Sequence, residues 1–532
     1  MLRVNEIKLP LDADRRAAYS AVAKSLRISE GDILSLKISK RSVDSRKKDN
    51  IFFVYSFDVE LNADEDTIAR AFPDSKVFKT EEYRYTMPEN KRVSKFRPVV
   101  VGFGPAGMFA SLVLAQAGLR PLIIERGNDV DTRTKDVKSF WSTRVLNENS
   151  NVQFGEGGAG TFSDGKLTTG IKDKRCRKIF EEFVANGAPE DILWSGTPHI
   201  GTDKLGEVVK SIRKKVIAMG GEVLFGCRLT DIITANKAVF GVSYEKPDGT
   251  ITDFETDTVL LCIGHSARDT LEMLYAKGLE IMQKPFSAGA RIEHPQIMIN
   301  KAQYGAFYNH PSLAAADYKL ACHPPHGRGL YTFCMCPGGT VVTASSENGC
   351  VVVNGMSEYA RDGENANSAL LVGIEPEDFP SAHPLAGMYM QRGIEKAAFA
   401  AGGESYCAPA QLLGDFLKNT PSKKLGSVNP SCPTGVVPGD LRRVLPKKVT
   451  ETLAGSIADF DRKLHGFALP DAVLTGPETR SSSPVRIVRD DLYQTRIRGL
   501  YPCGEGAGYA GGIVSAGVDG LRVAETVLSD ER

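Results

Sequence analysis

Three glycines just after residue 98 constrain the fold of this chain more than any other feature of its sequence. Gly102, Gly104 and Gly107 form a G-x-G-x-x-G pattern that follows the apolar run 99–101 and precedes a helical run at 108–116. Gly102 permits a tight turn, Gly104 lets the backbone approach a pyrophosphate, and Gly107 allows close packing of helix on strand. Free N–H groups and the positive end of the helix dipole then face an anion. The sequence therefore predicts a strand–turn–helix unit that binds a dinucleotide.

An acidic residue stands where this unit needs a ribose ligand. Glu125 follows the predicted second strand, 121–124, at the usual distance from the glycines. A carboxylate at this place accepts hydrogen bonds from both hydroxyls of an adenosine ribose, whereas a 2′-phosphate would need an Arg. The pattern does not distinguish NAD from FAD, because both bind to this fold. The predicted dinucleotide ligands are Gly102, Phe103, Gly104, Pro105, Ala106, Gly107, Glu125 and Arg126.

Two further glycine patterns have different surroundings. The pattern at 155–160 lacks a strand and a helix around it, so we expect a loop that covers a ligand. The pattern at 506–511 follows a strand predicted at 500–503 and precedes a helix, but too few residues remain before position 532 for a second strand and its acidic residue. We therefore expect one nucleotide site, begun near residue 98 and completed by residues 499–529.

The charge balance excludes several classes of protein. Lys and Arg total 66, and Asp and Glu total 65, so the formal charge is +1. Proteins that bind nucleic acids or membrane surfaces through their overall charge carry a basic excess, and we expect neither partner here. Residues 98–119 contain no charged side chain, but their glycines and Pro105 would break a spanning helix.

The cysteine content indicates a reducing compartment. Ten cysteines in 532 residues are too sparse for a disulfide framework, and residues 1–16 contain no apolar signal core. We therefore expect a cytoplasmic protein.

The first 90 residues predict a small α+β domain. A helical run at 12–26 precedes strands at 33–38 and 51–59. The basic run 40–48 between these strands is interpreted as a solvated connection. A docking surface for RNA or for an acidic partner is the alternative.

The rest of the chain predicts an α/β protein in which a Rossmann-like domain is interrupted by an insertion. A linker at 91–97 leads into the first part of the nucleotide-binding domain at 98–282. Residues 283–445 are rich in Gly, Pro and short β-like runs, which predicts a β-rich inserted substrate or cap domain. Residues 446–532 would return to the nucleotide-binding domain and complete it.

Several of these segments resemble known flavoproteins. Three segments resemble the glutathione-reductase-like superfamily of FAD flavoproteins, in which two dinucleotide-binding domains are common. They are residues 102–125, the strand 259–264 and the closing segment 499–508. That superfamily usually has Gly-Asp in the closing motif, where this chain has Gly504 and Glu505. Longer motifs resemble a bacterial family of FAD-dependent dehydrogenases over nearly the whole chain; they lie at 154–167, 264–269, 332–339 and 478–486.

The resemblance implies FAD as the cofactor and assigns further residues to it. The loop after the first unit would cover the pyrophosphate and the flavin. The terminal helix would point its positive end at the flavin, where its dipole stabilises negative charge on the reduced ring. The residues implied in this way are Gly158, Ala159, Gly160, Thr161, Asp164, Lys166, Leu229, Cys262, Gly264, Gly504, Glu505, Gly512 and Ile513.

Four residues of the predicted insertion and its return are candidate substrate ligands. Arg291 and Glu293 alternate on a predicted strand at the start of the insertion, where an ordinary ion pair is the alternative. Arg480 could bind a carboxylate or phosphate, or hold a loop over the flavin. Cys336 lies two positions after Cys334, so both side chains point to one face of a strand. Two interpretations of these cysteines remain open: they are a redox-active pair, or they are two small buried hydrophobic residues.

No metal site is predicted. His323 and His326 precede the two cysteines, but this combination of spacings matches none of the usual structural zinc patterns.

Together these patterns predict an FAD-dependent oxidoreductase that transfers hydride through flavin N5. The expected partners are a small-molecule substrate and NAD(P)H as a transient reductant. The alternatives are an RNA- or protein-binding module whose flavin is structural or redox-sensing, and an NAD-dependent dehydrogenase that uses the same site. The residues alone identify neither the substrate, nor the catalytic residues, nor the oligomeric state.

Overall fold

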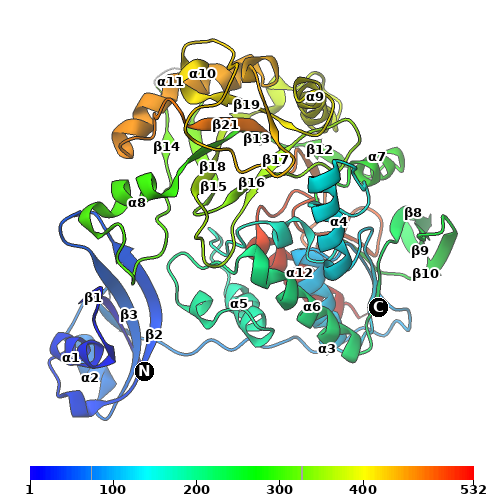
Figure 1. The fold of residues 1–532 in the computed structure, drawn as a ribbon. Coiled ribbons are helices and arrows are strands. Elements are labelled where there is room, and N and C mark those ends of the chain that lie inside the picture. Colours follow the sequence, from blue (N-terminus) through cyan, green and yellow to red (C-terminus); the bar gives the residue numbers. More distant parts are fainter. Residues whose placement is uncertain (74, 325–326, 532) are drawn as a thin grey trace.

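The computed structural model describes residues 1–73, 75–324 and 327–531. At the N-terminus, strands β1 (Leu2–Pro10), β2 (Ile33–Asp44), β3 (Phe52–Leu61) and β4 (Val77–Lys79) form an antiparallel sheet in the order β2-β3-β1-β4. Helix α1 (Arg15–Leu26) buries Ala18, Val22 and Leu26 in the core of this unit, which also includes the short helix α2 (Glu65–Arg70). The unit projects at the lower left of Figure 1. The sequence patterns did not predict β1.

The basic run at 40–48 attaches this unit to the rest of the chain. Its first half continues β2 as far as Asp44. The backbone N–H of Arg41 donates to the Trp194 carbonyl at 2.8 Å, and the Arg41 guanidinium lies 4.6 Å from the centre of the Trp194 ring. The Lys48 ammonium contacts the carbonyl of Gln303. The prediction of a solvated connection holds at Lys40, Arg46 and Lys47, which are exposed. It is wrong at Arg41 and Lys48, which contact the body of the protein.

A parallel sheet forms the centre of the molecule. Its strand order is β23 (Leu500–Pro502), β11 (Val259–Leu261), β5 (Val99–Val101), β6 (Leu122–Ile124) and β7 (Glu222–Leu224). The register places Val259 opposite both Val99 and Leu500. The last strand of the chain thus completes the sheet that begins at residue 99. This is the arrangement that the closing glycine pattern predicts, and it confirms an α/β fold.

Different elements cover the two faces of this sheet. Helices α3 (Pro105–Gln116), α5 (Arg175–Ala185), α6 (Thr202–Ala218) and α12 (Ile513–Ser529) share a hydrophobic core with one face. The meander β8 (Arg228–Ala235), β9 (Ala238–Glu245) and β10 (Ile251–Glu255) covers the other face together with α7 (Arg268–Ala276). Because both faces are covered, the strands of this sheet are apolar along nearly their whole length.

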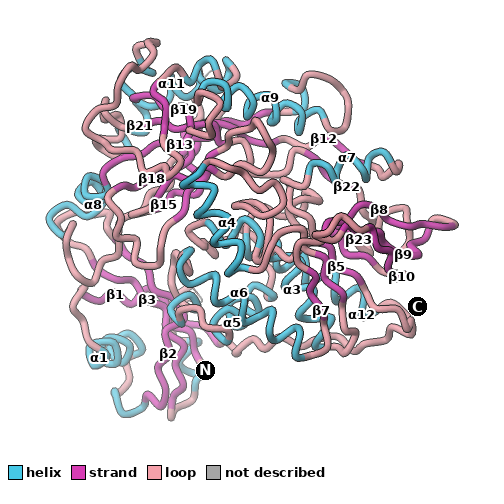
Figure 2. Tube along the Cα trace, turned by 45° about the vertical axis from the view of Figure 1, so that its right-hand side comes forward, coloured by secondary structure: helices cyan, strands magenta, loops and turns pink. Residues whose placement is uncertain are grey.

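A second, larger sheet forms the cap. Its order is β14 (Ala321–Cys322), β15 (Leu330–Cys336), β18 (Asn365–Ile374), β13 (Phe286–Pro295), β21 (Val473–Glu478), β19 (Ala408–Leu412) and β20 (Val436–Pro438). Its pairings are antiparallel except that of β19 with β20. Helices α8 (Gln296–Tyr304), α9 (Ala386–Ala401), α10 (Leu413–Leu417) and α11 (Lys447–Lys463) contribute to its core. Figure 2 shows these strands above the helical layer of the first domain.

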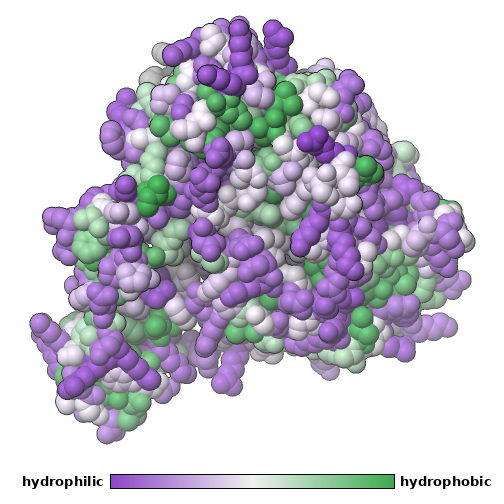
Figure 3. Space-filling view, in the orientation of Figure 1, coloured by the Kyte–Doolittle hydropathy of each residue, from purple (hydrophilic) through white to green (hydrophobic). Residues whose placement is uncertain are grey.

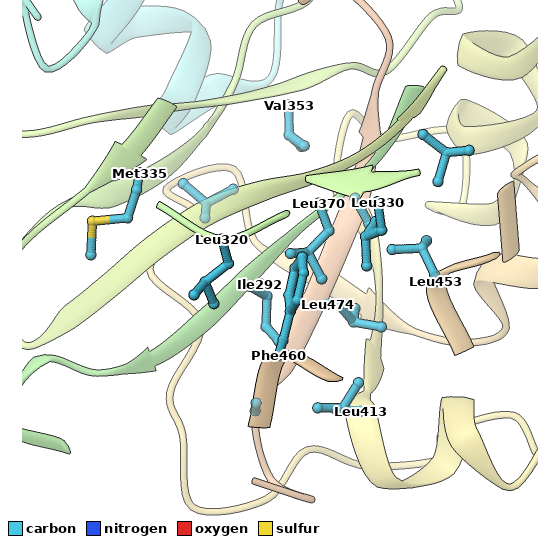
Figure 4. Packing of buried hydrophobic residues seen from close by; sticks show 14 of the residues in the cluster. Ile292, Leu320, Leu330, Met335, Val353, Leu370, Leu413, Leu453, Phe460 and Leu474 are labelled. Carbon is cyan, nitrogen blue, oxygen red and sulfur yellow. The ribbon is translucent and has the colours of Figure 1, made fainter. Parts of the chain in front are cut away.

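Smaller elements link the two domains. Strands β16 (Thr340–Thr343) and β17 (Val353–Met356) form a hairpin, and β12 (Ile281–Gln283) pairs with β22 (Val485–Ile487) where the chain enters and leaves the cap. Helix α4 (Val130–Thr143) follows β6 and contributes Phe140 to the cap core. Figure 4 shows that core, with Phe460 of α11 packed among residues of the strands.

The cap extends beyond the predicted boundary at residue 445. Thr475 on β21 lies opposite Arg291 on β13 and opposite Ala410 on β19. Strand β21 therefore lies inside the cap sheet, and the chain returns to the parallel sheet only after Glu478. The prediction placed the return too early, because it assigned residues 446–478 to the first domain.

The surface mixes polar and apolar side chains, as Figure 3 shows for one face. Throughout the described ranges, the helices fall short of the length and apolar character that crossing a bilayer requires.

Candidate active site

A cavity of about 620 Å³ lies between the parallel sheet and the cap. The turns after β5, β6 and β11 line one side, with Gly104, Glu125 and Gly264. Strands β15 and β21 line the other, with Cys334 and Glu478. Ligands of open α/β sheets bind outside the carboxyl ends of the strands, so this cavity lies where the fold predicts a cofactor.

The predicted cofactor ligands divide into two groups. Those that line the cavity are Gly102, Gly104, Pro105, Ala106, Glu125, Arg126, Gly158, Ala159, Gly160, Lys166, Leu229, Cys262, Gly264, Glu505, Gly512 and Ile513. Those outside its lining, within the described part of the chain, are Phe103, Gly107, Thr161, Asp164 and Gly504.

The dinucleotide turn has the backbone geometry that its glycines predict. Gly102 has a φ of 95°, in the left-handed region that favours glycine. A Cβ at Gly107 would lie 1.9 Å from the Gly102 carbonyl oxygen, so Gly107 packs helix α3 against the turn rather than contacting a ligand. Helix α3 begins at Pro105 without a side-chain cap, and its first turn faces the cavity. Its dipole therefore makes this end of the cavity suitable for a pyrophosphate.

The buried carboxylate of Glu125 organises the loops around the turn. It accepts backbone N–H hydrogen bonds from Phe103 at 2.7 Å, Gly127 at 2.9 Å and Gly155 at 3.0 Å. A carboxylate has roughly four acceptor positions, so about one is left for a ribose hydroxyl. The prediction that Glu125 binds both hydroxyls is therefore too generous.

A buried arginine holds the loop that covers the cavity. Arg133 on α4 is fully buried and donates to the carbonyls of Asn151, Val152, Glu156 and Gly158 at 2.7–2.9 Å. Burial lowers the pKa of Arg133 to about 10, which still leaves it charged at neutral pH. These bonds fix Gly158 beside Gly104: a Cβ at Gly158 would lie 3.0 Å from the Gly104 Cα.

Two predicted ligands in this loop have structural contacts instead. The Thr161 hydroxyl donates to the Glu156 carbonyl at 3.2 Å. The buried carboxylate of Asp164 pairs with the guanidinium of Arg361 in the cap. Both side chains face away from the cavity because they tie the loop to its own backbone and to the cap.

Lys166 also lines the cavity, with its ammonium buried. Its Nζ lies 3.5 Å from Asp164 Oδ2 and makes no hydrogen bond within the described chain. Asp164 is already neutralised by Arg361. Lys166 therefore offers a positive charge to an anionic ligand.

The C-terminal segment supplies a second helix N-terminus. Helix α12 begins at Ile513 without a side-chain cap, and Gly511, Gly512 and Ile513 line the cavity. Gly504 lies behind the lining, since its N–H donates to Asp519 at 2.7 Å and a Cβ there would lie 2.7 Å from Ala106 Cβ.

A histidine that the sequence analysis left unassigned lies beside Glu505. His265 Nδ1 is 3.3 Å from Glu505 Oε1, and the two side chains line the cavity together. The imidazole is buried, and neither ring nitrogen makes a hydrogen bond among the described residues. A buried polar group without a partner is costly, so His265 and Glu505 fit a ligand with hydroxyl or carbonyl groups, such as a ribityl chain.

Of the predicted substrate ligands, only Arg480 lines the cavity. The guanidinium of Arg291 is fully buried behind the cap wall, where it donates to Glu478 at 2.6 Å and Asn367 at 2.6 Å. Glu293 accepts from the Ser431 hydroxyl at 2.6 Å, and burial raises its pKa. Arg291 and Glu293 therefore do not face substrate, because the central strand β13 is covered on both sides. Cys336 is also buried outside the lining.

The cap wall is instead formed by residues that were not predicted as ligands. Glu478 ends β21, Cys334 lies in β15, and Tyr318 precedes β14; all three line the cavity. Burial raises the pKa of the Tyr318 hydroxyl, although its side-chain interaction with Ser368 opposes this. Cys334 and Glu478 occur in the quoted motifs, but only strand pairing shows that they face the site. His326, which had been considered with His323 as a metal ligand, lies outside the described residues.

The donor set fits FAD. The site offers positive charge through two helix N-termini without side-chain caps and through the Lys166 ammonium. Positive charge suits a pyrophosphate and an electron-rich ring. The glycine cradle, Glu125 and the His265–Glu505 pair suit ribose and ribityl hydroxyls.

Comparisons with known proteins agree with this geometry. A family model described as "FAD-dependent protein, C-terminal domain-like" matches residues 285–481, which span β13 to β21 of the cap. A "Domain of unknown function (DUF8436)" matches residues 1–60. An "Uncharacterized protein" of Clostridium beijerinckii is 47% identical over 529 residues, covering 99% of this chain and 98% of that protein. The chain belongs to the family of this clostridial protein. FAD is the cofactor of this chain, as the sequence predicts.

Solved structures resemble members of this family more distantly. A flavin-dependent brominase is 13% identical with a TM-score of 0.39, covering 82% of this chain and 79% of that one. A geranylgeranyl bacteriochlorophyll reductase-like protein from Thermoplasma acidophilum is 14% identical with a TM-score of 0.37, covering 82% and 78%. Similarities this low identify neither a reaction nor a substrate for the family. Membership of the glutathione-reductase-like superfamily stays a prediction.

Proposed function

We propose that this chain is an oxidoreductase, a dehydrogenase or reductase, in which a hydride passes between flavin N5 and a substrate carbon or a nicotinamide. The supporting observation is one continuous cavity that runs from the dinucleotide turn at Gly104 to the cap wall at Glu478. Bound FAD supplies the redox chemistry by exchanging two electrons as a hydride. The protein supplies binding, orientation and exclusion of water.

The nucleotide end of the site binds the pyrophosphate and ribose of the cofactor and takes no part in the hydride transfer. Pyrophosphate charge is stabilised by the first turn of α3, and Glu125 has about one acceptor position left for a ribose hydroxyl. Arg133 holds the covering loop by its carbonyls, so the cradle is formed before the cofactor binds. A preformed cradle lowers the entropy cost of binding.

The other end of the site carries positive potential. The N-terminus of α12 and the Lys166 ammonium line the cavity near the cap. Both stabilise negative charge, so they favour the reduced, more anionic form of the cofactor.

A buried ion cluster holds the cap over the site. Glu395 on α9 receives hydrogen bonds from Arg268 on α7 at 2.8 Å and from Arg480 after β21 at 2.7 Å. The two guanidinium groups hold the pKa of Glu395 well below its usual range, although burial opposes this. Arg268 belongs to the first domain and Glu395 to the cap, so the cluster fixes one against the other. Its charges are already paired, and we assign Arg480 to holding the cap rather than to binding substrate.

Two measurements test this proposal. The purified protein should show flavin absorbance, or gain it on reconstitution with FAD, and stopped-flow mixing with NADH and NADPH should bleach that absorbance. A colourless protein that cannot be reconstituted would overturn the assignment. Flavin absorbance that neither nicotinamide bleaches would exclude NAD(P)H as the donor and direct the search to other reductants.

A further inference from the structure

Two cysteines lie together on the cap wall of the cavity. Cys334 lines the cavity, whereas Cys336 is buried just behind it. The Cys336 thiol lies 3.2 Å from the Cys334 carbonyl oxygen, and it also interacts with the Cys334 thiol. The two sulfur atoms are therefore neighbours, with one of them open to a bound ligand.

The backbone between these cysteines departs from a regular strand. Strand β15 pairs regularly with β18 up to Phe333, and the register shifts before Cys336. Cys334 has a φ of 42°, in the left-handed region that non-glycine residues rarely occupy. In a regular strand the spacing between alternate residues would strain a disulfide. The bulge removes that regular spacing, so this source of strain does not apply to a bond between these two sulfurs.

The surrounding charges favour a thiolate at Cys334. Arg291 lies 3.1 Å from the Cys334 carbonyl and 3.9 Å from Cys336 Sγ, and Lys166 lines the same cavity. The interaction of Cys334 with the Cys336 thiol, followed by these two cations, lowers the pKa of Cys334, although burial opposes this. A thiolate is the reactive form in sulfur chemistry.

A second neighbouring pair, of which Cys262 also lines the cavity, differs from this one at its other thiol, that of Cys503. Cys262 and Cys503 follow the parallel strands β11 and β23. Burial raises the pKa of Cys503 well above its usual value, so Cys503 stays protonated at neutral pH. It serves as an internal comparison.

We propose that Cys334 and Cys336 form a redox-active dithiol that exchanges two electrons with FAD, an inference that rests on the proposed function. In the oxidising direction a sulfur–sulfur bond forms between the two residues. The Cys334 thiolate and the Cys336 thiol together lose two electrons and one proton, and FAD gains both to become its anionic reduced form. The reverse step breaks the sulfur–sulfur bond and restores FAD.

Counting thiols in the full-length FAD-loaded protein tests the proposal. The protein is oxidised with ferricyanide, denatured in iodoacetamide and weighed by mass spectrometry. All ten cysteines are free in the structure and would take up ten groups. We expect eight labelled cysteines, that is ten minus two, and peptide mapping should identify a bond between Cys334 and Cys336. After dithionite reduction all ten should react.

A reductive titration measures how many electrons the oxidised protein takes up per FAD. The oxidised wild-type protein should take up four electrons per FAD, and Cys336→Ala should take up two with unchanged flavin absorbance. Cys334→Ser gives a second test should Cys336→Ala fold poorly. Cys176→Ser, on α5 outside the cavity lining, is the matched control and should still take up four.

The proposal fails if the oxidised protein retains ten reactive thiols, if the bond maps to Cys262 and Cys503, or if the wild type takes up only two electrons. These outcomes are distinct from failure of the proposed function. A protein that does not bind FAD rejects both, whereas a yellow protein with a two-electron uptake rejects only the dithiol.

Discussion

Gly520 on α12 lies directly against the backbone carbonyl of Ala106 on α3: a Cβ at position 520 would be 2.2 Å from that oxygen. The last helix of the chain therefore packs backbone to backbone on the helix that begins at the dinucleotide turn. Both helices share one core with the parallel sheet. The stability of the cradle thus depends on a residue far from it in the sequence.

Adding a methyl group at this contact should destabilise the protein. Gly520→Ala forces the two helices apart, and we expect a loss of about 1–3 kcal/mol in the free energy of unfolding, measured by urea denaturation, together with weaker FAD retention. Gly393→Ala on α9 is the control, because a Cβ there meets nothing within 4 Å. Equal stabilities of the two variants would show that the helices separate without cost.

Glu125→Gln should weaken FAD binding without unfolding the protein. The amide keeps one acceptor oxygen but turns its NH₂ group toward the backbone N–H donors of the turn. Hydrogen bonds to charged groups contribute about 1.5–3 kcal/mol, so we expect the Kd for FAD to rise by roughly 10- to 100-fold. Fluorescence titration of the FAD-free protein measures this. Glu190→Gln, at an exposed position, should leave the Kd unchanged.

Lys166→Met should lower the reduction potential of the bound flavin. The variant removes a positive charge that has no hydrogen-bond partner in the described chain and lines the cavity. We expect a fall of roughly 20–40 mV, since about 30 mV corresponds to 1.4 kcal/mol for a two-electron couple. Spectroelectrochemistry gives the potential, with exposed Lys172→Met as the comparison. An unchanged potential would place Lys166 away from the ring.

Glu395→Gln should loosen the cap. The change leaves the guanidinium groups of Arg268 and Arg480 buried without their shared carboxylate. Removing one partner of a buried ionic cluster costs about 3–5 kcal/mol, and limited proteolysis of the cap should accelerate. Exposed Glu377→Gln provides the comparison. A variant as stable as the wild type would mean that the cluster contributes nothing to holding the cap.

His294 should make the fold sensitive to mild acid. The imidazole is fully buried and donates from Nε2 to the Phe467 carbonyl at 2.8 Å, and burial lowers its pKa from 6.5 to about 4. The unfolded chain therefore binds a proton as the pH falls through 6.5, while the folded chain does not. The stabilisation is complete above pH 6.5 and is lost toward pH 4, by about 3 kcal/mol.

Urea denaturation across that pH range measures the effect. His294→Gln should flatten the pH profile between 6.5 and 4, whereas His465→Gln, at an exposed position, should not alter it. A wild-type profile that is already flat would contradict the assignment.

The sequence predicts the local geometry of the nucleotide end well. Gly102, Gly107 and Glu125 act through neighbours in the same turn or through adjacent parallel strands, so a short motif contains most of the information. The same reasoning misplaces Arg291 and Glu293. Alternation along β13 predicts that they share a face, but not that Glu478 and Ser431 bind the two side chains inside the cap.

The cap wall depends on contacts between distant segments. Cys334 faces the cavity because β15 shifts register against β18, and Glu478 faces it because β21 lies between β13 and β19. Neither the bulge nor the strand order leaves a periodic signal in the residues themselves. The boundary at residue 445 was misplaced for the same reason.

By itself, the amino-acid order determined the α/β class, the dinucleotide turn and the need for a C-terminal strand to finish the sheet. These follow from backbone conformations that single residues impose and from hydrophobic periodicity within short segments. The tertiary structure alone decided which side chains face the cofactor from the cap and which charges are already paired. Those outcomes follow from strand pairing and burial across hundreds of residues, where the cost of an unpaired polar group is set by neighbours that are remote in the chain.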